Sequence, residues 1–128
     1  MNDLNNAILH TTTQQIIGCA YKISNTLGCG FLEKVYENAL AYELINSGFK
    51  VQQQYPIFVK YNAVVVGEYR ADLLVNEHII IELKAVKAFD EIHLAQCLNY
   101  LKATGLRLCL LMNFAKPKVE VRRIVSNL

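Results

Sequence analysis

The stretch ADLLVNEHIIIELKA, residues 71–85, consists of two apolar runs joined by a short polar segment. This is the pattern of a buried β-hairpin, because the runs are rich in Val, Ile and Leu and their length suits strands. Two carboxylates and an ammonium group nevertheless lie inside the pattern, on Asp72, Glu82 and Lys84. A hydrophobic core excludes unpaired charge, so these three side chains need another explanation.

Hairpin geometry supplies one explanation for the charges. A turn centred on Glu77 places Asp72 directly opposite Glu82, on one face of the sheet, with Cβ atoms about 5 Å apart. Carboxylates so close repel each other, and a divalent cation such as Mg²⁺ or Mn²⁺ removes the repulsion. Lys84 would then orient or deprotonate a metal-bound water, or stabilise charge on a phosphate. The stretch predicts metal-assisted phosphodiester hydrolysis, unless a one-residue shift separates the carboxylates and the charges merely line a solvated edge strand.

The whole chain of 128 residues has the length of one domain, 1–128. Amphipathic periodicity and glycine caps predict a first helix over about 4–27, a second helix ending near Gly48, and a third over 90–103. Extended runs are expected over 51–61, 64–75, 79–86 and 106–114, with a last strand from about 119. Pro56 suggests that the first strand lies at an edge or contains a bulge. The order ααβββαββ predicts an α/β domain.

The second helix carries a carboxylate, Glu33, in the segment GFLEKVY, residues 30–36, and two roles fit it. Leu32, Val35, Ala39 and the Leu40/Leu44 pair are expected to face inward, which places Glu33 at the margin of their stripe. From there its side chain can point toward the hairpin carboxylates. The alternative is that Glu33 only interacts with the helix dipole, since it falls in a first turn.

The third helix carries Gln96 and Tyr100 one turn apart, at positions i and i+4. The pair can belong to a functional site beside the helix. It can as easily consist of a boundary residue and a core aromatic. Neither interpretation is favoured by the helix alone.

Composition limits the classes of protein that fit. The formal net charge of +2 is mild for a dedicated nucleic-acid binder, and no uncharged stretch reaches the roughly 20 residues of a membrane span. The N-terminus lacks the pattern of a signal peptide, so a cytoplasmic protein is expected. The four cysteines have no metal-ligand spacing and are expected to be buried thiols. A hydrophobic share of 53% suggests apolar surface for a partner, and a two-fold homodimer is the expectation.

Taken together, these segments resemble the PD-(D/E)XK nuclease superfamily, and specifically its small group named for a GxxExxY motif. The resemblance runs over about residues 10–125. It rests on GFLEKVY (30–36), YRAD (69–72), IELKA (81–85) and HLAQ (93–96) with Tyr100. One departure is Ala71, which stands where the superfamily has Pro and where the residue only shapes the backbone.

The resemblance implies a fold and a role for each matching residue. The fold is a restriction-endonuclease-like αβββαβ core, a mixed central sheet flanked by helices, over about 30–125, with an extra N-terminal helix. Asp72, Glu82 and the Leu83 carbonyl would bind Mg²⁺ or Mn²⁺, with Glu33 as an added acidic ligand. Lys84 would be the catalytic lysine. Gln96 and Tyr100 would form a Q-x-x-x-Y element.

The leading expectation for function is therefore a Mg²⁺- or Mn²⁺-dependent nuclease that cuts DNA. A non-catalytic binding module that keeps the nuclease fold and a hydrolase of a smaller phosphate-containing substrate are the alternatives. The side chains expected to contact nucleic acid are Arg70, Lys84 and Lys87 near the site and Lys116, Lys118, Arg122 and Arg123 near the C-terminus. The alternative for the last four is solvating surface charge, the usual role of surface Lys and Arg.

Overall fold

The computed structural model describes residues 2–126, and side chains from residue 6 onward. The helices are α1 (Asn2–Leu27), α2 (Glu33–Asn46) and α3 (Glu91–Thr104), and the strands are β1 (Val51–Tyr61), β2 (Val64–Val75), β3 (Ile79–Lys84), β4 (Leu108–Asn113) and β5 (Glu120–Val125). The predicted order ααβββαββ is confirmed. The third extended run ends at Lys84 and not at residue 86.

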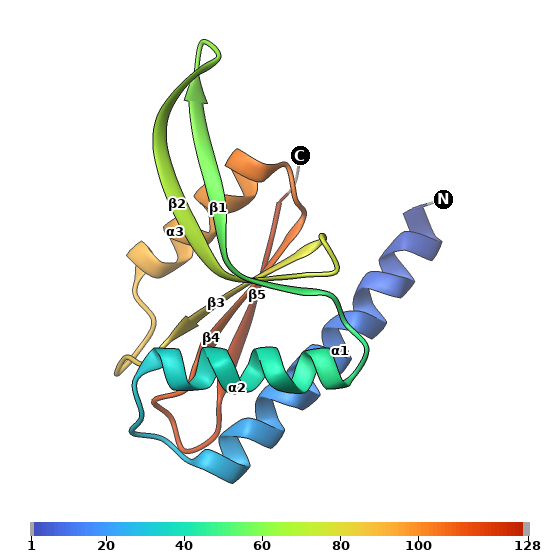
Figure 1. Ribbon diagram of the computed structural model, residues 1–128, viewed down its shortest axis with the longest axis vertical. Coiled ribbons are helices and arrows are strands. Elements are labelled where there is room, and N and C mark those ends of the chain that lie inside the picture. Colours follow the sequence, from blue (N-terminus) through green and yellow to red (C-terminus); the bar gives the residue numbers. More distant parts are fainter. Residues whose placement is uncertain (1, 127–128) are drawn as a thin grey trace.

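The five strands form one mixed sheet in the order β1-β2-β3-β4-β5. Only β3 and β4 are parallel, and α3 makes the crossover between them. Figure 1 shows the far part of the β1–β2 hairpin, about residues 56–70, projecting beyond the other strands; we call this part the hairpin arm. Pro56 lies on the edge strand, and the β1–β2 register shifts between Val59 and Lys60, so both expectations for this proline hold.

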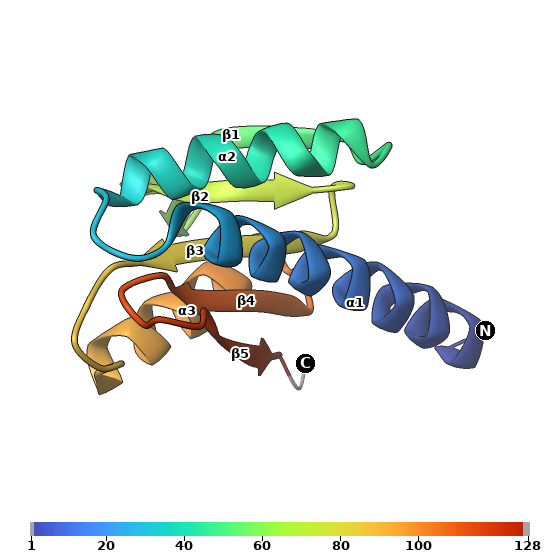
Figure 2. The same ribbon diagram turned by 90° about the horizontal axis from the view of Figure 1, so that it is seen from below.

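The sheet is the middle of three layers, with α1 and α2 on one face and α3 on the other (Figure 2). Each face has its own hydrophobic core. Cys97 and Cys109 are buried in the core under α3, whereas Cys19 is half-buried beside the other core. Cys29 is exposed in the α1–α2 connection, so the expectation of four buried thiols is wrong for this residue.

The buried face of α2 agrees with the predicted one at Leu40 and Leu44 and differs from it in the first turn. Leu32 is 80% exposed and Val35 is also exposed, while Tyr36, Leu40 and Leu44 are fully buried. The helix begins only at Glu33, and Leu32 has the extended backbone of an N-cap residue, so it lies outside the helical periodicity. The corrected stripe of residues one turn apart places Glu33 on the side of α2 that faces the sheet.

Tyr36 fixes the connection that leads into α2. Its hydroxyl donates to the Gly28 carbonyl at 2.7 Å and accepts from the Phe31 N–H at 3.2 Å, and its ring stacks on Phe114 with centroids 4.7 Å apart. Gly30 between these contacts has φ of 115°, which other residues adopt only with strain. The glycine and the tyrosine of the GxxExxY segment therefore hold the start of α2, and with it Glu33, against the end of the sheet.

No helix in the described part of the chain has both the length and the apolar composition that crossing a bilayer requires.

Candidate active site

The predicted hairpin register is confirmed, and it ends at the charged residues. Leu73 pairs with Ile81, and the pairing continues toward the turn through Leu74 and Val75. Beyond Leu73 the β1–β2 hairpin bends away from β3 (Figure 1), so Asp72 and Glu82 have no backbone ladder between them. The two strands thus form a fork, with one carboxylate on each side.

The carboxylates replace the missing ladder bonds at the fork. The Asp72 N–H donates to Glu82 Oε1 at 3.2 Å, and the Leu83 N–H donates to Asp72 Oδ2 at 2.8 Å. Buried backbone donors need partners, and here each strand's carboxylate satisfies an N–H of the other strand. The carboxylates are held at the fork because the backbone requires acceptors there.

The Leu83 carbonyl and the Glu33 carboxylate also face the fork, as contacts at the end of β3 indicate. The Lys84 carbonyl accepts from the Phe114 N–H on the β4 side. Because successive residues of a strand point their backbone groups to opposite sides, the Leu83 carbonyl faces the fork. The Glu33 Oε2 accepts from the Ala85 N–H at 3.3 Å, so α2 delivers a third carboxylate to the edge of β3.

Crowding and burial change the acid strength of the paired carboxyls. Burial first, and then the charges of Asp72 and Glu33, raise the pKa of Glu82 to about 8, while the Lys84 ammonium, 3.7 Å from Oε2, opposes the rise. Burial also raises the pKa of Asp72, against the lowering effect of the Leu83 N–H. The pair therefore keeps a proton near neutral pH when no cation is present.

The donor set fits a hard divalent cation that keeps part of its water shell. Among the described side chains, no three His, Cys, Asp or Glu residues are grouped closely enough to hold a metal ion by themselves. A cation at the fork would rely on Asp72, Glu82, the Leu83 carbonyl and water. Mg²⁺ and Mn²⁺ accept such oxygen sets, and Mg²⁺ commonly uses only one or two carboxylates.

Gln96 and Tyr100 lie beside the strand that leads into Asp72. The Tyr100 hydroxyl accepts from Gln96 Nε2 at 2.9 Å and donates to the Arg70 carbonyl at 3.4 Å. Burial and the charges of Glu82 and Asp72 raise the pKa of Tyr100, so the hydroxyl stays protonated. The pair thus steadies the β2 segment just before the fork.

The basic side chains do not form one surface. Arg70 is exposed near the fork, donates to the Gln54 carbonyl at 3.1 Å and pairs with Glu68 at 3.5 Å. Lys87 is exposed just after β3. Register places Glu82 level with Leu111, and Leu111 level with Arg122, so Arg122 lies on the face of Glu82, where its guanidinium lies over the Phe89 ring.

The other C-terminal basic residues lie apart from this face. Arg123 points to the opposite side of the sheet, 3.5 Å from His10 of α1, and Lys118 lies over the Tyr21 ring of α1. Lys116 is half-buried in the β4–β5 turn. The structure therefore brings Arg122 to the face of Glu82, keeps Arg70 and Lys87 close to the fork along the chain, and leaves Lys118 and Arg123 on the α1 side.

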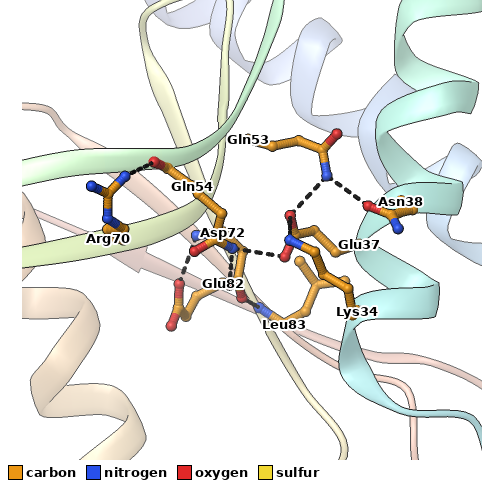
Figure 3. Close-up of polar contacts among 9 residues, drawn as sticks. All are labelled: Lys34, Glu37, Asn38, Gln53, Gln54, Arg70, Asp72, Glu82 and Leu83. Carbon is orange, nitrogen blue, oxygen red and sulfur yellow. Dashed lines mark hydrogen bonds and ion pairs between the residues drawn. The ribbon is translucent and has the colours of Figure 1, made fainter.

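Two residues near the fork were not anticipated from the sequence. Glu37 of α2 is buried, and Gln54 of β1 donates to both Glu37 and Asp72 (Figure 3). The available signal for Glu37 was its position one turn after Glu33, on the corrected stripe of α2. For Gln54 the signal was the β1–β2 register, which places it opposite Asp72 and depends on the bulge after Val59.

We expect Glu82→Gln to stabilise the metal-free protein in a pH-dependent way. The native pKa of Glu82 is about 8 against an ordinary value of 4.5, so the native state resists ionisation. The cost is absent below pH 4.5, grows with pH, and is complete above pH 8. In urea unfolding with EDTA, the variant should gain roughly 2–4 kcal/mol at pH 8.5 and almost nothing at pH 4.5.

Glu77→Gln is the matched control, because Glu77 lies in the exposed turn of the same hairpin and pairs with the exposed Lys50. It should change the unfolding free energy by less than about 0.5 kcal/mol at either pH. An equal gain for Glu82→Gln at both pH values would contradict the assigned cause.

Comparison with known proteins places this geometry in a family. Residues 10–124 match the family described as the PD-(D/E)XK nuclease superfamily. No significant match was found among curated proteins.

Two solved structures share the fold. The crystal structure of SSO0001 matches with a TM-score of 0.56 and 18% identity, over 74% of this chain and 50% of that one. The alkaline exonuclease LHK-Exo from Laribacter hongkongensis matches with a TM-score of 0.55 and 16% identity, over 73% of this chain and 56% of that one. The chain thus spans about half the length of either structure, and the expected restriction-endonuclease-like core is confirmed. Since the family match covers most of the chain and the fold agrees, the protein belongs to the PD-(D/E)XK nuclease superfamily.

Proposed function

We propose that the protein is a metal-dependent nuclease that hydrolyses phosphodiester bonds of DNA. The observation that carries the proposal is the fork, where the carboxylates of Asp72 and Glu82 meet the edge of β3 beside the Lys84 ammonium. Neutral side-chain oxygens could accept from the same backbone N–H groups, so the fork itself does not require two carboxylates that repel each other, whereas a cation site does.

In this proposal each residue has a distinct task. Asp72, Glu82 and the Leu83 carbonyl hold Mg²⁺ or Mn²⁺, which when bound acidifies water and neutralises charge on the phosphate. The Lys84 ammonium lies beside the carboxylates and stabilises negative charge that grows on the phosphate oxygens as a water oxygen attacks phosphorus and the P–O ester bond breaks. Glu33, bonded to the Ala85 N–H, accepts a hydrogen bond from the attacking water.

We also propose that the chain belongs to the GxxExxY group within the superfamily. The three residues that name the motif have separate jobs in this fold. Gly30 takes a left-handed backbone, Glu33 reaches the fork, and Tyr36 ties the loop to the start of α2.

The nucleic acid would approach from the face that carries Glu82. Arg122 lies on this face, and Arg70 and Lys87 lie close to the fork along the chain; we assign all three to phosphate contacts, which position a strand without reading its sequence. We leave Lys116, Lys118 and Arg123 out of this surface, because the last two lie with α1.

We expect Asp72→Ala to abolish Mn²⁺ binding and Lys84→Ala to abolish turnover alone. An ammonium cannot ligate a cation, so Lys84→Ala should keep Mn²⁺ affinity, measured by calorimetry, and lose at least roughly 100-fold in kcat on plasmid and single-stranded DNA. Lys22→Ala serves as the control, because Lys22 is exposed on α1 and pairs with Glu43.

The outcomes separate the candidate functions. Metal binding with DNA binding and no turnover in the unmodified protein would leave a non-catalytic binding module. Turnover only of a small phosphodiester would favour the hydrolase alternative. Equal Mn²⁺ affinity for the unmodified protein and Asp72→Ala would remove the proposed metal site.

We expect Glu33→Gln to lower activity at least about tenfold, worth about 1.4 kcal/mol of barrier, without lowering stability. The change removes a negative charge that raises the pKa of both Asp72 and Glu82. A helix-dipole residue would instead lose about 0.3–1 kcal/mol of stability and no activity. Glu43→Gln, on the same helix, is the control for both measurements.

We further propose a two-fold dimer. The hairpin arm exposes large apolar side chains on a projecting element, namely Phe58, Tyr61, Val64, Val65, Val66 and Tyr69. Sedimentation at micromolar concentration should give twice the chain mass of 14.5 kDa. A stable monomer would refute the dimer, and Val65→Lys should shift a true dimer toward monomer.

A further inference from the structure

Glu37 is a buried carboxylate that the proposed chemistry does not use. It is 3% exposed and accepts three hydrogen bonds, from Lys34 Nζ at 3.0 Å, Gln53 Nε2 at 2.8 Å and Gln54 Nε2 at 2.9 Å. Each partner donates, so the carboxylate is fully satisfied where it lies. Glu37 therefore forms a rigid acceptor beside the fork, built into α2 (Figure 3).

Gln54 links this acceptor to the fork. Its Nε2 also donates to Asp72 Oδ1 at 3.3 Å, so the two hydrogens of one amide are shared between two carboxylates. Without this amide the Asp72 carboxylate would keep, among the described residues, one hydrogen bond, from the Leu83 N–H to Oδ2. One bond leaves a carboxyl group free to rotate, whereas bonds to both oxygens fix its plane.

The backbone at Gln54 is arranged for this contact. Gln54 has φ of 53°, in the left-handed region that a glutamine seldom occupies. On the neighbouring strand β2, the face of the side chains changes across Asp72. Ala71 lies in the core under α3, whereas Leu73, two residues on, lies in the core under α1 and α2. In a regular strand both would lie on one face. The local twist therefore coincides with the Gln54–Asp72 pair.

A neutral donor suits this position better than a cation. Glu37 raises the pKa of Asp72 through its charge, and a lysine between them would cancel charge that a metal ion needs. An amide orients Asp72 and separates it from Glu37 while leaving its charge intact. We infer that Gln54 is a positioning residue that fixes the Asp72 carboxylate for metal binding, and that Glu37 anchors the Gln54 amide. The part about metal rests on the proposed function.

The test compares Gln54→Leu, Gln54→Gly and the control Gln53→Leu. Gln53 also donates to Glu37, and to Asn38, but does not touch Asp72, so its loss removes an equivalent Glu37 contact. Gln54→Gly removes the amide at a backbone angle that glycine adopts freely, so it keeps the test valid if Gln54→Leu fails to fold.

The first measurement needs no metal. The Leu83 amide donates to Asp72, so its ¹H–¹⁵N resonance and its hydrogen exchange report where the carboxylate lies. Both Gln54 variants should move this resonance upfield and speed its exchange, and Gln53→Leu should leave both unchanged. An unaltered Leu83 amide in Gln54→Gly would overturn the inference.

The second measurement is Mn²⁺ affinity by calorimetry. Both Gln54 variants should bind Mn²⁺ about 10–100-fold more weakly than the unmodified protein, as is typical when the partner of a metal ligand is lost, and Gln53→Leu should match the unmodified protein. A shifted Leu83 amide with undiminished Mn²⁺ affinity would overturn the role in metal binding. If the unmodified protein binds no Mn²⁺, the proposed function fails, and the Leu83 amide still decides whether Gln54 holds Asp72.

Discussion

The site depends on the need of backbone N–H groups for acceptors where β2 leaves β3. The pairing of β2 with β3 ends at Leu73, and beyond it the N–H of Asp72 and that of Leu83 each donate to a carboxylate in place of a carbonyl. An unpartnered buried donor costs roughly 1–3 kcal/mol, so a fork in the middle of a sheet needs substitutes. The side chains of Asp72 and Glu82 are those substitutes, and the same atoms that hold the fork together supply the charge for the proposed chemistry.

This arrangement explains why charge interrupts an apolar hairpin. Ile80 and Ile81 of β3 lie in the two cores, one on each face, so the strand is apolar on both sides until the fork opens. From Glu82 onward only β4 pairs with β3, and the other edge is free for Glu33, Asp72 and the Leu83 carbonyl. A charged residue one position earlier would lie in a closed ladder. The charges therefore begin where the pairing stops.

Much of the fold follows from local rules, and the errors follow from information that is not local. The strand order, the limits of β1 and β2 and the 73–81 register could be predicted, because periodicity and a short turn determine them, whereas β3 and β4 are shorter than their apolar runs. The start of the inward stripe of α2 was misassigned because Leu32 is a cap residue, and the Tyr36–Gly28 contact reveals where the helix begins. Gln54 could not be identified, since its place opposite Asp72 depends on a bulge. The division between Arg122 and Arg123, by contrast, was available from strand alternation alone.

The donors around the fork differ in what they do to its charge. Backbone N–H groups and the Gln54 amide orient the carboxylates and leave the site negative, whereas the cationic charge of Lys84 lowers the pKa of Glu82. A site built with more lysines would be more stable alone and would attract a divalent ion less, since the ion would gain less by relieving repulsion. The raised pKa of Glu82 is then a consequence of keeping the fork negative. A proton neutralises part of that negative charge until a cation displaces it. On this view the neutral residues near Asp72 matter as much as the charged ones, because they maintain geometry without weakening the field.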